Sequence, residues 1–217
     1  MPRAQRILGD GFTYHVVSNC NAGEFLFRDA CDFQAFLRHL EECRQSFGFE
    51  LHAYCLLHSH IHLILTTRNG VFLDKVMYEI CQRFARRYNK NNARCGHFWK
   101  DRYFSKVISS DAYGLVCLRY LHMNPVRAGL VDHPARWPWS CARHYLHKDQ
   151  NSLLTLLPSY LSLSSEEMIR GKLYQRWLNS KLISNAEEKF LMLSRTRVGS
   201  KRYQQIVRKL SPLLPAK

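Results

Sequence analysis

The strongest constraint on the fold comes from two runs of β-forming residues, 50–57 and 60–67, which lie only two residues apart. Runs spaced so closely predict a β-hairpin. Side chains alternate across a strand, so His60 and His62 are expected on one face of the sheet and the aliphatic residues beside them on the other. The chain should therefore contain an antiparallel sheet, one face of which carries paired imidazoles.

Further elements are predicted on both sides of the hairpin, from β-forming runs and from apolar residues at helical spacing. They are strands at 13–19 and 102–109 and helices at 29–48, 72–93 and 111–124, the last of which is expected to end before Pro125. The order is strand, helix, strand, strand, helix, strand, with one more helix after it. This order is typical of a ferredoxin-like α+β fold with an antiparallel sheet.

The charge of the chain indicates a polyanionic partner. Its 217 residues include 32 Lys and Arg against 17 Asp and Glu, which gives a formal net charge of +15. Such a surplus attracts nucleic acid first and an anionic membrane surface second. No run approaches the ~18 apolar residues of a membrane-spanning helix, and no export signal is visible. The scattered cysteines are typical of reduced thiols, so we expect a cytoplasmic protein that is not embedded in a membrane.

The composition also suggests how the chain is divided. Residues 1–148 are expected to form one domain, and residues 149–217 a helical, basic C-terminal extension with helix starts at Asn185 and Ser200. Between residues 189 and 217 there are eight Lys or Arg and no acidic residue. A segment of this kind is typical of an appendage rather than of a second large domain.

Two pairs of side chains are candidates for chemistry. Neutral imidazoles two residues apart on a strand, as at His60 and His62, can bind one divalent cation together with a third ligand from elsewhere. Tyr120 and Asn124 are four residues apart and share one face of a helix; the amide oxygen suits Mg²⁺ or Mn²⁺, and the phenol could attack a phosphorus atom. The simpler interpretations are hydrogen-bonded sheet histidines and a packing tyrosine. The residues alone leave both interpretations open.

Four motifs follow one another between Tyr14 and Leu146: HIH after a β-run, GHFWKDRYFSK at 96–106, YLHMNPVRAGLV at 120–131 and WPWSCARHYL at 137–146. Together they resemble the REP-associated tyrosine transposases, within the single-tyrosine HUH transposase superfamily. The order of several motifs is more specific than any one of them.

The resemblance implies a ferredoxin-like HUH domain in which His60 and His62 are metal ligands, Tyr120 is the catalytic nucleophile and Asn124 is the third ligand of Mg²⁺ or Mn²⁺. It also implies that Tyr120 cuts single-stranded or hairpin DNA, keeps a 5′-phosphotyrosine link and frees a 3′-OH, so that no nucleotide cofactor is needed. Members often carry Pro-Asn before the HUH triplet, where this chain has His58-Ser59. We expect His58 to be an exposed turn residue.

The basic residues around these motifs suggest where DNA binds. Between Arg68 and Lys106 there are ten basic and three acidic residues. Most of them, taken singly, are better explained as a solvated helix face, but the joint excess indicates phosphate binding. The candidates for DNA contact are Arg83, Arg87, Arg102, Lys106 and Arg127.

The sequence thus favours a metal-dependent transposase-type endonuclease that cleaves and rejoins single-stranded or hairpin DNA, such as REP elements. The alternative is a catalytically idle, domesticated relative that binds structured DNA. A third class, a metal-dependent hydrolase, would form no covalent adduct with DNA. Whether the protein is a monomer or a homodimer stays open.

Overall fold

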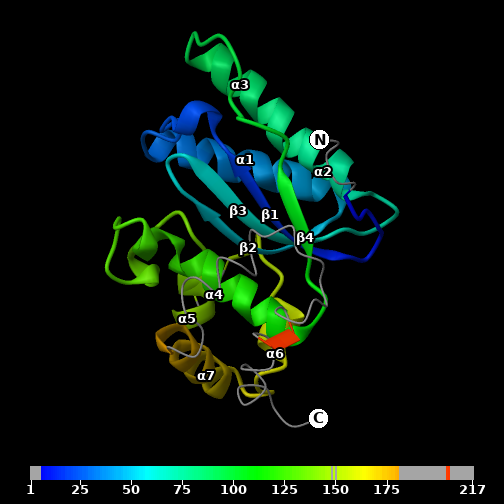
Figure 1. Cartoon of the computed structure of the whole chain (residues 1–217), viewed down its shortest axis with the longest axis vertical. Helices are drawn as coiled ribbons and strands as arrows, with labels where there is room; N and C mark the ends of the chain where they lie inside the picture. Colours follow the sequence, from blue (N-terminus) through cyan, green and yellow to red (C-terminus); the bar gives the residue numbers. More distant parts are fainter. Residues whose placement is uncertain (1–5, 148, 150, 181–203, 206–217) are drawn as a thin grey trace. The chain divides into compact units, whose positions relative to one another are not determined.

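The structure is a computed structural model that describes residues 6–147, 149, 151–180 and 204–205. The chain forms two compact units, Met1–Val107 and Ile108–Lys217 (Figure 1). The predicted division at residues 148 and 149 stays a prediction, and the helix starts predicted at Asn185 and Ser200 lie outside the described residues.

The first unit is built on a four-stranded sheet with the order β2-β3-β1-β4. Its strands are β1 (Thr13–Asn19), β2 (Glu50–Leu56), β3 (His60–Thr66) and β4 (Phe104–Val107). Every neighbouring pair of strands is antiparallel. Because helices connect β1 to β2 and β3 to β4, this is the βαββαβ order of a ferredoxin-like fold, and the predicted α+β class is confirmed. A short 3₁₀ turn, η1 (Asn21–Gly23), follows β1.

Helix α1 (Ala30–Phe47) has the predicted boundaries because both of its ends are specified locally. The carboxylate of Asp29 accepts hydrogen bonds from the backbone N–H groups of Cys31 and Asp32, which have no partner within the helix. Gly48 follows the helix with a φ of 64°, a left-handed conformation that glycine adopts without a Cβ clash. The start and the end of α1 can therefore be read from single residues.

The second helical segment of this unit has three parts, namely α2 (Leu73–Tyr78), the π-helical turn η2 (Glu79–Arg83) and α3 (Phe84–Asn91). Its extent agrees with the helix predicted over 72–93, but the π-helical turn was not predicted. Phe84 packs against Phe36 of α1, with ring centroids 4.9 Å apart. The Oγ of Ser18 in β1 lies 3.6 Å from the Sγ of Cys81 in η2. Helices α1, α2 and α3 thus form a layer on the face of the sheet to which Ser18 points (Figure 1).

The hairpin between β2 and β3 forms at the predicted place, with a hydrogen bond of 2.9 Å from the N–H of Leu57 to the carbonyl of His60. The prediction that His58 is exposed is wrong. Its side chain is half-buried, and Nδ1 lies 2.6 Å from the carbonyl oxygen of Phe27, to which it donates. The imidazole also meets the ring of Phe33 edge to face. His58 therefore ties the turn to the segment before α1, a long-range contact that alternation along a strand does not show.

Helix α4 (Asp111–Arg127) opens the described part of the second unit. Ser110 caps it by accepting a hydrogen bond from the N–H of Tyr113. The prediction that the helix ends before Pro125 is wrong, because the helix continues to Arg127. Proline lacks an N–H and removes one hydrogen bond from the ladder, a loss that is tolerable this close to the end of a helix. The chain turns at Gly129, whose φ is 68°.

Four further helical elements complete this part of the second unit: η3 (Pro134–Arg136), α5 (Ala142–His147), α6 (Pro158–Leu161) and α7 (Glu167–Asn179). Helices α5, α6 and α7 share a core of buried aromatic residues, in which the rings of Tyr145 and Tyr160 are 4.7 Å apart between centroids. The indole N–H of Trp177 in α7 donates to the carbonyl of Leu115 in α4 over 3.2 Å. Across the described helices, none has both the length and the apolar character needed to span a membrane.

Candidate functional site

One face of the sheet carries two of the predicted site residues. His60 opens β3 and His62 follows two positions later, so both side chains point to the same face, while Ile61 points to the other. The two imidazole rings meet edge to face with their centroids 5.0 Å apart. We call the side of the sheet on which they lie the histidine face.

A third histidine, which was not identified from the sequence, joins this pair. His15 in β1 is buried, its Nε2 lies 3.3 Å from Nδ1 of His62, and the two rings stack with centroids 5.5 Å apart. Burial, and then the positive charge of Lys106, lowers the pKa of His15 to about 3, so its ring is neutral near pH 7. In the sequence, the signal for His15 was its position as a polar residue within a run of β-forming residues. The strand register, which pairs Val17 with His62, is what places His15 on the histidine face.

The two imidazoles of the HIH motif each use Nδ1 for a contact within the protein. Nδ1 of His62 meets His15, and Nδ1 of His60 lies 3.1 Å from the hydroxyl of Ser59. A neutral ring that is held at Nδ1 would coordinate a cation through Nε2, and the Nδ1 partner fixes the orientation of the ring. Burial also lowers the pKa of His60, which favours the neutral form that binds metals. The chemistry of this donor pair therefore fits a divalent cation.

No set of three or more His, Cys, Asp or Glu side chains within the described ranges is arranged to hold a metal ion. Asn124, the predicted third ligand, is an amide and belongs to the second unit.

The second unit brings together three other predicted site residues at the end of α4. The side-chain amide of Asn124 donates from Nδ2 to the carbonyl oxygen of Tyr120 over 2.8 Å. Because the nitrogen is engaged in this way, Oδ1 is the atom that Asn124 can offer as a ligand. Arg127 donates from Nη1 to the same carbonyl over 3.1 Å, and its guanidinium carbon lies 5.0 Å from the centroid of the Tyr120 ring. The spacing of the YLHMNPVR motif thus gathers a phenol, an amide and a guanidinium on one side of the helix.

Two of the predicted DNA contacts belong to the chain around β4. Lys106 pairs directly with His15 across the β1–β4 ladder, so its side chain shares the histidine face. It is 9 % exposed, whereas Arg102, which precedes β4, is exposed. Lys106 therefore brings a positive charge to the side of the sheet that carries the imidazoles.

Arg83 and Arg87 lie elsewhere in the first unit. They belong to η2 and α3, in the helical layer that covers the face opposite the histidine face. Arg83 forms an ion pair with Glu79, and Nη1 of Arg87 lies 3.3 Å from a carboxylate oxygen of Glu42. The structure does not gather these arginines with the histidines, and their role in DNA binding stays a prediction.

Comparison with known proteins gives a consistent result. The family model described as "Transposase IS200 like" matches residues 10–124. A protein of Haemophilus influenzae with the provisional description of REP-associated tyrosine transposase is 29% identical to this chain over 106 residues. That match covers 44% of this chain and 60% of the relative, so the chain spans less than two thirds of the relative's length.

Solved structures show a related fold. A REP-associated tyrosine transposase bound to a REP hairpin superposes with a TM-score of 0.60 at 20% identity, over 73% of this chain and 93% of that chain. A protein of Deinococcus radiodurans provisionally described as a transposase covers 55% of this chain and 93% of its own, with 16% identity and a TM-score of 0.40, which is too low to support an argument. At these identities, the first likeness concerns the fold alone.

Proposed function

Because the chain belongs to the IS200-like transposase family, we propose that it cleaves and rejoins single-stranded or hairpin DNA through a covalent bond to Tyr120. REP palindromes are the substrates we favour, since one solved relative of the same fold is bound to a REP hairpin. The observation that carries the proposal is the pair of imidazoles at His60 and His62, each of which uses Nδ1 for a contact within the protein, so that Nε2 is the atom that can bind a cation.

The proposed metal ligands are His60, His62 and the amide oxygen of Asn124. When bound there, Mg²⁺ or Mn²⁺ would supply positive charge that stabilises the transition state and orients the scissile phosphate. His15 acts as a positioning residue, because its hydrogen bond to His62 holds that ring in its tautomer and orientation.

Tyr120 is the proposed nucleophile. Its phenolic oxygen forms a bond to phosphorus and the bond from phosphorus to the 3′ oxygen breaks, which leaves a 5′-phosphotyrosine and a 3′-OH. The phenolic proton is lost and the departing 3′ oxygen gains one. One phosphodiester replaces another, so the free 3′-OH can reverse the step without a nucleotide cofactor. A free phenol ionises near pH ~10, and the guanidinium of Arg127, 5.0 Å from the centroid of the Tyr120 ring, places a positive charge beside the proposed nucleophile.

The proposed DNA contacts are Lys106, Arg102, Arg127, Arg83 and Arg87. Lys106 shares the histidine face, and Arg102 is exposed at the start of the same segment. The side chains of Arg83 and Arg87 are exposed on the helical layer and are paired with Glu79 and Glu42, so they would attract DNA mainly through the long-range field.

The test is to incubate the protein with a labelled DNA hairpin that carries single-stranded flanks, in Mg²⁺ or Mn²⁺, and to look for a protein–DNA adduct that survives denaturation. Tyr120→Phe should abolish the adduct and the cleavage. Tyr78→Phe is the matched control. Tyr78 is an exposed residue of α2, so this change also removes a tyrosine hydroxyl, but outside the proposed site.

Three outcomes are informative. Cleavage that persists in Tyr120→Phe would contradict the nucleophile assignment. Cleavage without an adduct in the parent protein would indicate a hydrolase. Binding without cleavage in either metal would indicate a catalytically idle DNA-binding protein.

A further inference from the structure

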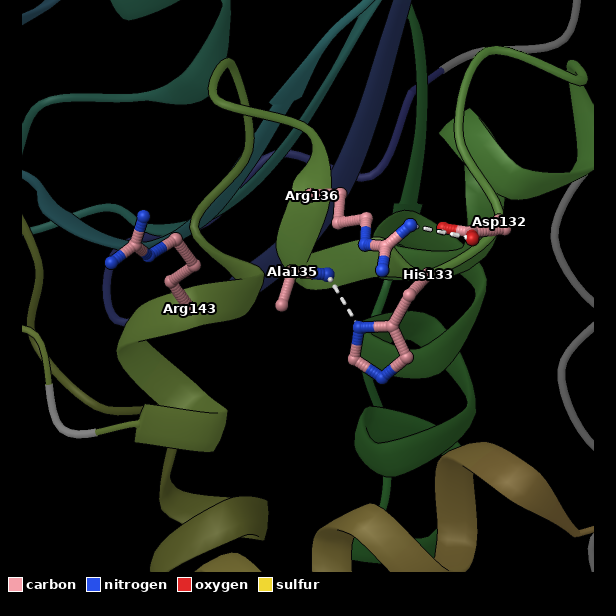
Figure 2. Close-up of a pocket in the computed structure, with 5 residues that line it drawn as sticks. All are labelled: Asp132, His133, Ala135, Arg136 and Arg143. Atoms are coloured by element: carbon pink, nitrogen blue, oxygen red, sulfur yellow. Dashed lines mark hydrogen bonds and ion pairs between the residues drawn. The ribbon is translucent and has the colours of Figure 1, made fainter.

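We propose that a basic cavity in the second unit binds the sugar–phosphate backbone of the DNA strand, an inference that rests on the proposed function. The cavity has a volume of about 670 Å³ and is lined by residues of η3, its approach and α5 (Figure 2). The lining residues are Asp132, His133, Ala135, Arg136 and Arg143.

The lining offers hydrogen-bond donors of the kind that phosphate oxygens accept. Arg136 and Arg143 belong to different elements, η3 and α5, and lie on either side of Ala135 (Figure 2). A guanidinium group matches phosphate oxygens with two parallel N–H donors. The backbone N–H of Ala135 donates to Nδ1 of His133 over 3.2 Å, so a neutral His133 ring carries its proton on Nε2 and offers a third donor.

The carboxylates beside the arginines do not prevent phosphate binding. Arg136 pairs with Asp132 at 2.7 Å, and Arg143 pairs with Asp149 at 2.7 Å. The Arg136 and Asp132 side chains are 70% and 68% exposed, and those of Arg143 and Asp149 are 59% and 43% exposed. Ion pairs this exposed are weak because water screens them, so a phosphate can replace either carboxylate at small cost.

The position of the cavity explains why a DNA strand is the ligand. Of the two elements that line the cavity, η3 packs against α5 and also against α4, the helix that carries Tyr120. A strand joined to Tyr120 continues on both sides of the joined phosphate, and its next phosphates need cationic partners close to α4. Arg136 and Arg143 supply two such partners on elements that are packed together, so we assign one backbone phosphate to each arginine.

The test measures the affinity for a fluorescent DNA hairpin with single-stranded flanks at several salt concentrations. Arg136→Gln and Arg143→Gln should each reduce the slope of log K against log salt by about 0.7, the value for a single-strand phosphate, and the double variant should lose about twice as much. Arg176→Gln is the matched control, since Arg176 is exposed on α7, outside the cavity lining. It removes the same charge and should leave the slope unchanged.

Asp132→Asn gives a test of opposite sign. This change removes the carboxylate that competes for Arg136 and should therefore strengthen DNA binding. Weaker binding by Asp132→Asn would overturn the proposal, because it would mean that the carboxylate itself contacts the DNA. Slopes that stay unchanged in both arginine variants, or no DNA binding by the parent protein, would overturn it as well.

The same proteins separate this proposal from the cleavage reaction. If the parent forms the covalent adduct while the arginine variants keep the parental slope, the cavity assignment fails and the proposed function stands. If no adduct forms but both arginine variants lose slope, the cavity assignment stands and the proposed function fails.

Discussion

Replacing His122 by glutamine should reduce the amount by which the free energy of unfolding of the second unit falls on acidification. His122 lies on α4 between Tyr120 and Asn124, and its side chain is buried. Its Nδ1 is 2.7 Å from the hydroxyl of Tyr174 in α7, and its Nε2 is 3.2 Å from the thiol sulfur of Cys141. Burial, and then the charge of His144, lowers the pKa of His122 to about 3.

The magnitude follows from the difference between the folded and unfolded states. An unfolded histidine has a pKa of about 6.5 and takes up a proton as the pH falls below that value, whereas the folded chain keeps His122 neutral down to about pH 3. The unfolded state therefore binds more protons in this window, and the slope of the free energy of unfolding against pH rises toward about 1.4 kcal/mol per pH unit as the unfolded histidine becomes fully protonated. Between about pH 7.5 and about pH 5 the loss from this one residue sums to about 2 kcal/mol.

The assay is urea unfolding followed by tryptophan fluorescence, because Trp177 is buried in the same core. Glutamine keeps a donor and an acceptor but does not titrate, so His122→Gln should lose about 2 kcal/mol less than the parent over this range. Tyr174→Phe removes a hydrogen-bond partner and keeps the imidazole; it should lower stability by about 1–2 kcal/mol at every pH without changing the slope. Equal losses on acidification in the parent and in His122→Gln would refute the argument that His122 is buried and neutral.

Three further predictions concern α4 and the metal. Gly114→Ala should destabilise the protein by about 1–3 kcal/mol, because a Cβ at this position would overlap the side chain of Ser159. Gly171→Ala, in α7, is its control: a Cβ there meets no described atom within 4 Å and should stabilise the helix by up to about 1 kcal/mol, both changes being measured by thermal unfolding. Ser110→Ala removes the N-cap of α4 and should cost about 1 kcal/mol in urea unfolding. Mn²⁺ should broaden the NMR resonances of the two HIH imidazoles, and a chelator should restore them; sharp lines in excess Mn²⁺ would contradict the metal assignment.

The parts of the fold that the sequence predicted well are those with local causes. Asp29 and Gly48 mark the two ends of α1 through a side-chain cap and a left-handed residue, and neither depends on distant contacts. The hairpin likewise follows from two runs separated by two residues. Pro125 gave the wrong end for α4, because a proline near the end of a helix removes one hydrogen bond without forcing the helix to stop.

The parts that were missed depend on pairing between distant segments. His15 becomes a neighbour of His62 only through the register of β1 against β3, which no single strand specifies. The imidazole of His58, in the turn after β2, donates to the carbonyl of Phe27. This contact joins the segment that precedes α1 in the sequence to a segment that follows it. The π-helical turn η2 inserts one extra residue into the helical repeat, which an apolar pattern with a period of 3.6 does not reveal.

The same register also divides the predicted DNA contacts of the first unit. Antiparallel pairing puts Lys106 beside His15, and His15 contacts His62. The Lys106 ammonium group and the three imidazoles therefore share one face of the sheet. The opposite face is covered by the layer that carries Arg83 and Arg87. The two faces of a sheet are separated by the backbone. A DNA strand bound along the imidazoles would therefore contact Lys106 and would not reach Arg83 or Arg87. Counting basic residues along the chain cannot draw this distinction, because Arg87 and Lys106 are near in sequence and belong to opposite faces.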